Sequence, residues 1–143
     1  MIKVDVKLVC DDCACSLIQH YDYKEKEKYT LFDILVEVES KEGWTITKDK
    51  DLCPECKKKY YPRTIEAAIN KLIETLDKKE RDIIKNTAKG ELIMFHHGFG
   101  TAIRNTFGLW NNNPALLKDC KCEHPDDASM VIIKALWKKL NEK

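Results

Sequence analysis

The sequence predicts an α+β protein in which a small β domain, residues 1–61, precedes a compact domain of about four α-helices, residues 62–143. Two Cys-x-x-Cys pairs and alternating apolar residues predict the β domain. Beyond Pro62, apolar residues recur every three or four positions, which is typical of helices that bury one face. We expect the boundary between the two domains near residues 57–63.

The four cysteines of the two pairs are Cys10, Cys13, Cys53 and Cys56, and 39 residues separate the pairs. Zinc binds four thiolates as a tetrahedron, and each Cys-x-x-Cys turn supplies two of them from one tight loop. Pro54 makes the second turn rigid because its ring fixes one backbone angle. The spacing therefore predicts one structural zinc ion, with a disulfide pair or a thiol redox motif as the alternatives.

A fifth cysteine, Cys15, lies two residues after the first pair. Replacement of Cys13 by Cys15 as a zinc ligand is one interpretation, although a one-residue loop fits the geometry of the turn poorly. A spare, partly buried thiol is the simpler interpretation.

Three segments of the first domain have the composition of β-strands. Residues 2–9 alternate apolar and charged side chains, and residues 30–39 and 43–48 are rich in β-branched and aromatic side chains. Residues 21–28 alternate in charge and lack an apolar face, so we predict an exposed loop or a hairpin tip there.

This order of strand, cysteine turn, strands and cysteine turn resembles the rubredoxin-like zinc ribbons of small bacterial and phage proteins. Glu42-Gly43-Trp44 and Asp51-Leu52-Cys53-Pro54-Glu55-Cys56 carry the resemblance, which covers residues 1–61. The resemblance implies a metal site and a fold, and it does not imply an activity.

Cysteine content and hydropathy predict the compartment. The chain holds seven cysteines, an odd number, and begins Met-Ile-Lys-Val-Asp-Val-Lys, which is unlike a signal peptide. Metal-bound thiolates in a reducing cytoplasm fit these features better than secreted disulfides do. No apolar run approaches the roughly 20 residues that cross a bilayer, so we expect a soluble cytoplasmic protein without a membrane partner.

The charge distribution argues against a nucleic-acid partner. Residues 1–62 carry 11 lysines against 13 acidic side chains, and residues 63–143 carry 14 basic against 11 acidic side chains. Zinc-bound thiolates make the first domain more negative, whereas phosphate binding needs a basic surface. A small patch at Lys57-Lys58-Lys59-Tyr60-Tyr61 keeps nucleic-acid binding as a lesser alternative, because aromatic side chains stack on bases.

Four helices are expected in the second domain. The first begins near Pro62, and the second follows a capping signal at Asp77-Lys78-Lys79-Glu80. The third runs from about residue 89 to residue 106. The fourth begins near Pro125, with acidic residues in its first turn, where they favour the helix dipole.

Residues 95–110, in and after the third predicted helix, hold two histidines, an arginine and several glycines. Helical spacing places His97, Gly100 and Arg104 on one face. A glycine inside a helix costs about 1 kcal/mol relative to alanine. Close helix packing, or a ligand or loop against the backbone, should offset that cost.

With the downstream segment His124-Pro125-Asp126-Asp127-Ala128-Ser129, this stretch resembles a bacterial and phage family of unknown function over about residues 77–140. The shared pattern is Phe-His-x-Gly-x-Gly-x-x-Ile-Arg-Asn, then Leu-Trp-x-x-Asn, then His-Pro-Asp-Asp-x-Ser. The matching positions are Phe95, His96, Gly98, Gly100, Ile103, Arg104, Asn105, Leu109, Trp110, Asn113, His124, Pro125, Asp126, Asp127 and Ser129. The resemblance implies no established activity.

The polar residues of this pattern allow three interpretations. In the first, Arg104 pairs with Asp126 or Asp127, and a buried polar network fixes how the last two helices pack. In the second, Arg104 and a histidine bind an anionic small molecule or the end of a peptide. In the third, a histidine acts as a general base that an aspartate orients. The candidate ligand-binding residues are His96, His97, Arg104, Asn105, Asp126 and Asp127.

A second metal site is a further alternative. Cys120, Cys122 and His124 are permitted zinc ligands, and His96 or His97 would complete a tetrahedron. Their alternate spacing brings three ligands together only if the loop curls tightly.

The sequence therefore favours a zinc-binding, non-enzymatic binding or adaptor protein, associated with a phage or mobile element. Its helical domain is expected to recognise a protein or a small anionic ligand. An enzyme that uses a His/Asp/Arg site in the helical domain is the first alternative, although no nucleophile elbow, phosphate loop or His-Glu-x-x-His pattern accompanies it. A nucleic-acid-binding zinc-ribbon regulator is the second alternative.

Overall fold

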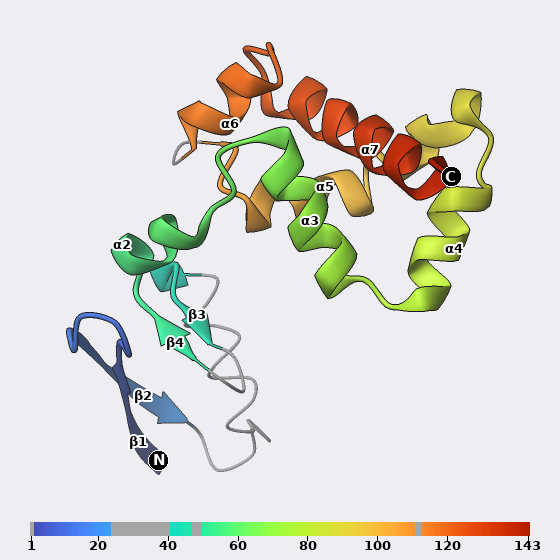
Figure 1. Cartoon of the computed structure of the whole chain (residues 1–143). Helices are drawn as coiled ribbons and strands as arrows, with labels where there is room; N and C mark the ends of the chain where they lie inside the picture. Colours follow the sequence, from blue (N-terminus) through green and yellow to red (C-terminus); the bar gives the residue numbers. More distant parts are fainter. Residues whose placement is uncertain (1, 24–40, 47–49, 111–112) are drawn as a thin grey trace. The chain divides into compact units, whose positions relative to one another are not determined.

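The computed structural model describes residues 2–23, 41–46, 50–110 and 113–143 (Figure 1). The chain divides into two compact units, Met1–Tyr60 and Tyr61–Lys143, and each unit has a hydrophobic core of its own. Strands and short helices make up the first unit, and helices make up the second. The protein therefore has the α+β fold class that the sequence predicts.

The described residues of the first unit form two antiparallel strand pairs and two short helices (Figure 1). The elements in chain order are β1 (Ile2–Val9), β2 (Ser16–Tyr23), β3 (Thr45–Ile46), β4 (Asp51–Leu52), α2 (Pro54–Lys57) and the 3₁₀ helix η1 (Lys58–Tyr60). β1 pairs with β2 over all eight of its residues, and β3 pairs with β4. The first Cys-x-x-Cys turn follows β1, and the second follows β4.

The strand predictions have mixed outcomes. The strand at residues 2–9 is confirmed as β1, and part of the strand at residues 43–48 is confirmed as β3. The loop predicted at residues 21–28 is wrong for Tyr21–Tyr23, which belong to β2 because backbone pairing with β1 outweighs the missing apolar face. Residues 24–28, 47–48 and the strand predicted at residues 30–39 lie outside the described residues.

Among the described residues of the first unit, cysteines supply half of the buried core. These buried residues are Leu8, Cys10, Trp44, Leu52, Cys53 and Cys56. Three partly buried apolar side chains pack against them. A metal bound by these cysteines would add to the apolar burial that offsets the chain entropy of folding.

Helices of modest length form the second unit (Figure 1). They are α3 (Ile65–Thr75), α4 (Lys78–Asn86), the 3₁₀ helix η2 (Lys89–Phe95), α5 (Phe99–Thr106), α6 (Pro114–Asp119) and α7 (Pro125–Asn141). The capping box at the start of α4 is confirmed: the Asp77 carboxylate accepts from the Glu80 N–H, and the Glu80 carboxylate accepts from the Asp77 N–H. The predicted start of α7 at Pro125 is also confirmed.

The single helix predicted from residue 89 to residue 106 is wrong. The segment forms η2, then a turn at residues 96–98, then α5. Gly98 has φ −86° and ψ −80°, which is outside the helical region, and it stands immediately before α5. Only Gly100 of these two glycines is helical. A Cβ on Gly100 would lie 3.0 Å from Arg104 Nη1 and 3.3 Å from the Phe95 carbonyl oxygen, so close packing explains why glycine stands there.

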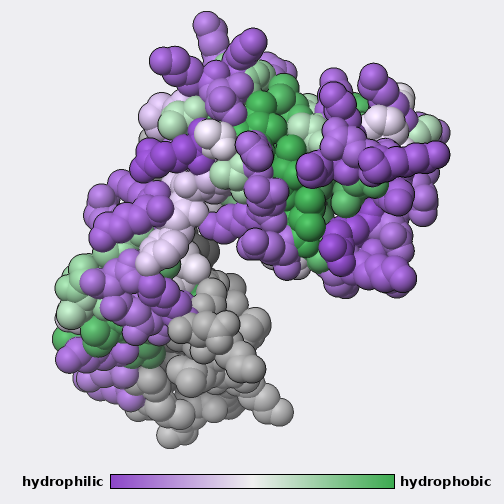
Figure 2. All heavy atoms as spheres, viewed as in Figure 1, coloured by the Kyte–Doolittle hydropathy of each residue, from purple (hydrophilic) through white to green (hydrophobic). Residues whose placement is uncertain are grey.

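Helix α7 lies at the centre of the second unit. It packs against α3, α4, η2 and α5, and its buried residues Ala128, Ile132, Ile133 and Leu136 are fully enclosed. Figure 2 shows apolar residues of this unit as a green band between purple, hydrophilic faces. The unit thus has the one-faced helices that the apolar spacing predicts.

A buried asparagine, Asn113, links the start of α6 to two segments that lie earlier in the chain. Asn113 Nδ2 donates to the carbonyl oxygens of Pro62 at 2.7 Å and Phe107 at 2.8 Å, and Asn113 Oδ1 accepts from the Leu116 N–H. The side chain thereby caps α6 and joins it to the segment before α3. The sequence prediction omitted α6, although Asn113-Pro114 is an ordinary signal for the start of a helix.

We expect Asn113→Ala to lower the free energy of unfolding of the helical unit by about 3 kcal/mol. Two buried carbonyl groups lose their donor, and α6 loses its cap. Urea unfolding followed by far-UV circular dichroism measures the effect. Asn141→Ala is the matched control, because the Asn141 amide makes the same two kinds of bond at an exposed site. A loss no larger in Asn113→Ala than in Asn141→Ala contradicts the role of Asn113.

None of the helices in the described part of the chain combines the length and the apolar character that a membrane crossing requires.

Candidate functional site

The four cysteines of the two Cys-x-x-Cys pairs meet at one point in the first unit. The Sγ atoms of Cys10, Cys13, Cys53 and Cys56 all lie within 4.8 Å of one another. The Sγ atoms of Cys13 and Cys53 are 3.8 Å apart, which is far beyond the length of a disulfide bond. Sulfur atoms bound at 2.3 Å around a tetrahedral zinc ion are about 3.8 Å apart. The cluster therefore has the spacing of a single four-thiolate metal site.

Backbone turns place these sulfur atoms and donate hydrogen bonds to them. Cys53 is the N-cap of α2, and its sulfur accepts from the Cys56 N–H at 3.4 Å. The Cys53 N–H donates to Cys10 Sγ at the same distance. In the first turn, Ala14 adopts φ 58°, a left-handed conformation, and its N–H donates to the Cys10 carbonyl oxygen. Such N–H···S bonds orient the thiolates and stabilise their charge.

The pKa values of two of these thiols are shifted in opposite directions. Burial favours a high pKa for Cys10, but backbone N–H groups directed at its sulfur outweigh burial and lower the pKa to about 6. Burial, followed by the neighbouring thiols, raises the pKa of Cys56 to about 12. The thiolate form is thus favoured at Cys10 and disfavoured at Cys56, where burial and neighbouring thiols oppose a negative charge. A divalent metal removes that opposition because its charge stabilises every thiolate at once.

A polar triad beside the cluster joins the two cysteine turns, and the sequence prediction did not identify it. Lys50 Nζ lies 2.5 Å from Asp12 Oδ1 and donates to the Tyr60 hydroxyl at 2.6 Å, while the Tyr60 hydroxyl donates to Asp12 Oδ2 at 2.8 Å. The hydrogen bond from Lys50 lowers the pKa of Asp12. Asp12 lies between the first two cysteines, so the triad ties that turn to the residues around the second turn.

The proposed nucleic-acid patch at residues 57–61 is engaged inside the first unit. Lys58 Nζ donates to Glu55 Oε1, Lys59 Nζ lies 3.9 Å from Cys56 Sγ, and Tyr60 belongs to the triad. A phosphate backbone would compete with these contacts for Lys58 and Lys59. Cys15 is not one of the four grouped sulfur atoms, but it is exposed rather than partly buried as predicted, and its thiol hydrogen-bonds with Cys13 and Cys53, which raises its pKa to about 12.

In the helical unit, Arg104 is 5% exposed, and the protein's own groups bind its guanidinium. Nη1 donates to Ser129 Oγ at 2.8 Å, and Nη2 donates to Thr101 Oγ1 at 2.9 Å and to the His96 carbonyl oxygen at 3.3 Å. Nε lies 3.2 Å from Asp126 Oδ1 as an ion pair without the alignment of a hydrogen bond. This geometry matches the first of the three interpretations, in which a polar network joins α5 to the start of α7.

Of the other candidate residues of the helical unit, Asp126 and the His96 carbonyl group contact Arg104, and the remaining three face solvent. His97, Asn105 and Asp127 are exposed. The ring of His96 meets the ring of His97 edge to face, and His96 Nδ1 is buried without a hydrogen-bond partner among the described residues. No hydrogen bond or ion pair within the described chain joins either histidine to Asp126 or Asp127. The histidine beside Asp126 is instead His124, whose Nδ1 lies 3.6 Å from Asp126 Oδ2, so the His/Asp pair of this network does not include His96 or His97.

The segment Asp119–His124 does not assemble a second metal site. Among the described residues, the four cysteines of the first unit are the one group of three or more candidate ligands that share a point. Cys120 is buried in the helical core, and burial raises its pKa to about 11. The Cys122 thiol donates to the Cys120 carbonyl oxygen, and His124 Nδ1 accepts from the Asp126 N–H as the cap of α7.

An apolar groove of about 210 Å³ lies in the helical unit, and no sequence pattern predicts it. It is lined by Leu76, Glu80, Ile83, Ile84, Phe95 and Phe99. These residues come from the end of α3, from α4, and from the two sides of the break at residues 96–98. The groove exists because that break turns Phe95 and Phe99 toward α4.

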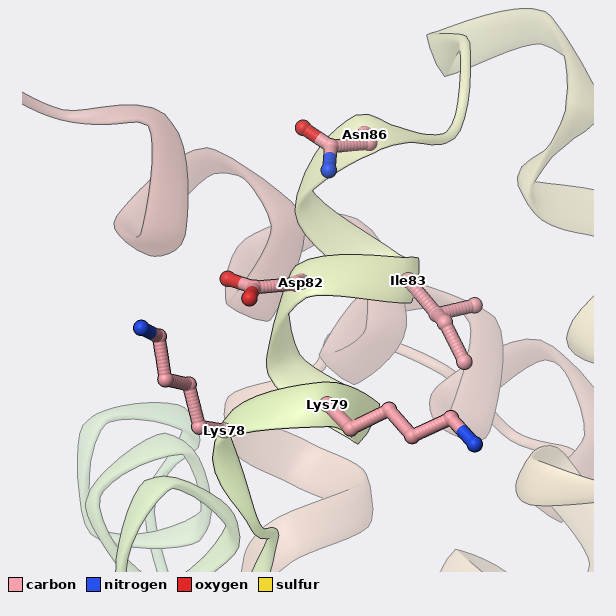
Figure 3. Close-up of a pocket in the computed structure, with 5 residues that line it drawn as sticks. All are labelled: Lys78, Lys79, Asp82, Ile83 and Asn86. Carbon is pink, nitrogen blue, oxygen red and sulfur yellow. The ribbon is translucent and has the colours of Figure 1, made fainter.

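Ile83 also borders a second, shallower depression on α4, which is lined by Lys78, Lys79, Asp82, Ile83 and Asn86. Figure 3 shows Lys79 and Ile83 extending to one side of α4, and Lys78 and Asp82 extending to the other. Ile83 therefore stands on the ridge between the apolar groove and a charged face. Its side chain is 53% exposed, which is unusual for an isoleucine beside a groove.

Comparison with known proteins identifies the helical unit. The model of a family described as a domain of unknown function (DUF6794) matches residues 61–140. No curated protein and no solved structure matches the chain. The match begins at the first residue of the helical unit, earlier than the start near residue 77 that the pattern predicts. It covers more than half of the chain, so the chain belongs to the DUF6794 family.

Proposed function

We propose that the protein is a zinc-binding, non-enzymatic adaptor. One structural zinc ion on Cys10, Cys13, Cys53 and Cys56 holds the first unit together, and the helical domain binds a protein partner at the apolar groove of α4. The observation that carries the zinc assignment is the spacing of the four sulfur atoms. All four positions of the tetrahedron are filled by protein ligands, which is typical of structural rather than catalytic zinc.

The burial and the hydrogen bonds of Arg104 favour a binding function over a catalytic function for the helical domain. Its guanidinium already has partners on α5 and α7, and it is nearly enclosed. A group that stabilises developing charge must reach the reacting atoms, and a substrate cannot reach this one without first breaking the network. Arg104 is therefore interpreted as a packing residue, and recognition is assigned to the surface.

The groove and its surroundings define the chemistry of the partner. Six residues line it, and only Glu80 among them is charged, so it suits a bulky apolar side chain. Lys78 and Lys79 lie on the adjoining face without a carboxylate within 4 Å in the described part of the chain. We therefore expect an amphipathic helix of a partner protein, with an apolar anchor for the groove and acidic residues facing these lysines.

Site-specific photo-crosslinking in cells that produce the protein tests this assignment. The probe is p-benzoylphenylalanine in place of Ile83 in the full chain. The matched control carries it in place of Ile93, which is 64% exposed but does not line the groove. We expect a discrete cross-linked protein from position 83 and none of the same mass from position 93.

The partner identified by cross-linking is then purified, and its affinity for the full chain is measured. Ile83→Glu should lower the affinity of the full chain for this partner at least tenfold. The new carboxylate on the ridge repels acidic residues of the partner, and the apolar contact of Ile83 is lost. Ile93→Glu should leave the affinity within twofold. Equal cross-linking from both positions, or unchanged affinity in Ile83→Glu, contradicts the groove as the binding site.

A further inference from the structure

A depression of about 490 Å³ lies between η2 and α7, away from the Arg104 network and the α4 groove. It is lined by Lys89, Leu92, Lys134, Ala135, Trp137 and Lys138. The two elements pack directly against each other, so the depression belongs to one rigid part of the helical unit. None of its residues belongs to the family pattern at residues 95–129.

The floor of the depression is apolar and fixed in place. Leu92 is 1% exposed and belongs to the core. The Trp137 indole Nε1 donates to the Thr87 carbonyl oxygen at 2.8 Å, which holds the ring in one position. An indole anchored by its N–H presents its remaining surface to a flat apolar group without loss of side-chain entropy.

The rim of the depression is entirely cationic. In the part of the chain that the structure describes, no carboxylate lies within 4 Å of Lys89, Lys134 or Lys138, and no acidic residue lines the depression. By contrast Lys139, on the next position of α7, pairs with Glu142 at 3.7 Å. Lys134 and Lys138 are one helical turn apart, where like charges destabilise a helix. A bound anion removes this repulsion.

We propose that this depression binds a small organic anion with a flat apolar body. The anionic group, a phosphate of the kind found in aryl or nucleoside phosphates, lies among the three lysines, and the body lies on Leu92 and Trp137. Ammonium groups hold phosphate as point charges, and an apolar floor favours a ligand with an aromatic ring over free phosphate. This inference is independent of the proposed adaptor function, because the two sites share no residue.

Titration of the ¹⁵N-labelled full chain with 1-naphthyl phosphate tests the proposal by NMR. We expect saturable shifts of the Trp137 indole N–H and of the Lys134 and Lys138 amides. Inorganic phosphate, which lacks the apolar body, and 1-naphthol, which lacks the charge, should each bind at least tenfold more weakly.

The double variant Lys134→Ala/Lys138→Ala should bind 1-naphthyl phosphate at least tenfold more weakly than the parent protein does. Lys139→Ala, the matched control on the same helix, should leave its affinity unchanged, since Lys139 does not line the depression. Alanine is a strong helix former, so both variants should retain the spectrum of the folded protein. Unshifted Trp137, or equal weakening by Lys139→Ala, overturns the proposal.

Discussion

Cys53→Ser is expected to unfold residues 2–23 and 41–60 while the helical unit stays folded. The Cys53 thiol is one of the four clustered candidate ligands, and a serine hydroxyl is a poor ligand for zinc, so one substitution opens the four-sulfur site at the centre of the unit. Binding of structural zinc contributes about 10 kcal/mol or more to the folding of small domains. The ¹H–¹⁵N spectrum should therefore lose the dispersed signals of the first unit.

Chelation of the metal in the unmodified protein should produce the same partial spectrum. The Trp44 indole reports the first unit, because it is buried in that core, and the Trp137 indole reports the helical unit. Cys15→Ser is the control, since Cys15 lies outside the four-sulfur group, and its spectrum should match that of the parent. A first unit that keeps its dispersed signals after the metal has been removed contradicts a structural metal.

The second large effect is expected from Arg104→Ala, which should lower the free energy of unfolding of the helical unit by about 3 kcal/mol or more. The substitution removes three hydrogen bonds and one ion pair, and it leaves a cavity beside Gly100. Hydrogen bonds to charged groups contribute about 1.5–3 kcal/mol each when buried, although these contributions are not additive. Because Asp126 is 40% exposed, its unpaired carboxylate remains solvated, which limits the loss.

Asn105→Ala is the matched control for Arg104→Ala. It lies next to Arg104 on α5, but it is exposed and outside the network, so we expect a change within about 0.5 kcal/mol. Urea unfolding followed by far-UV circular dichroism compares the two variants. If the Arg104→Ala protein is as stable as the Asn105→Ala protein, Arg104 does not stabilise the packing of the helices, and a role in ligand binding is then favoured.

Local chemistry decides which features the sequence could predict. The cysteine spacing, the Asp77–Glu80 capping box and the start of α7 at Pro125 each depend on residues a few positions apart, and the structure contains all three. The strand Ile2–Val9 follows in the same way from its alternating side chains. In each case the interaction that fixes the element lies inside the motif itself.

The missed features depend on contacts between distant segments. The burial of Arg104 follows from its contact with Ser129, which is 25 residues further along the chain. A Cβ on Gly100 would lie 3.3 Å from the Phe95 carbonyl oxygen, across the break at residues 96–98, and 3.5 Å from Ser129 Oγ, and helical periodicity does not contain these contacts. The α4 groove needs α3, α4 and α5 in their packed positions, so it is invisible until the helices are assembled.

The metal content of the freshly purified full chain is the most direct test of the central claim, and native mass spectrometry measures it. The account predicts one zinc ion per chain in the parent and in Cys15→Ser, and none in Cys53→Ser. A metal-free parent whose mass is lower by the hydrogens lost in a disulfide, with an intact first unit, would contradict a zinc-built fold.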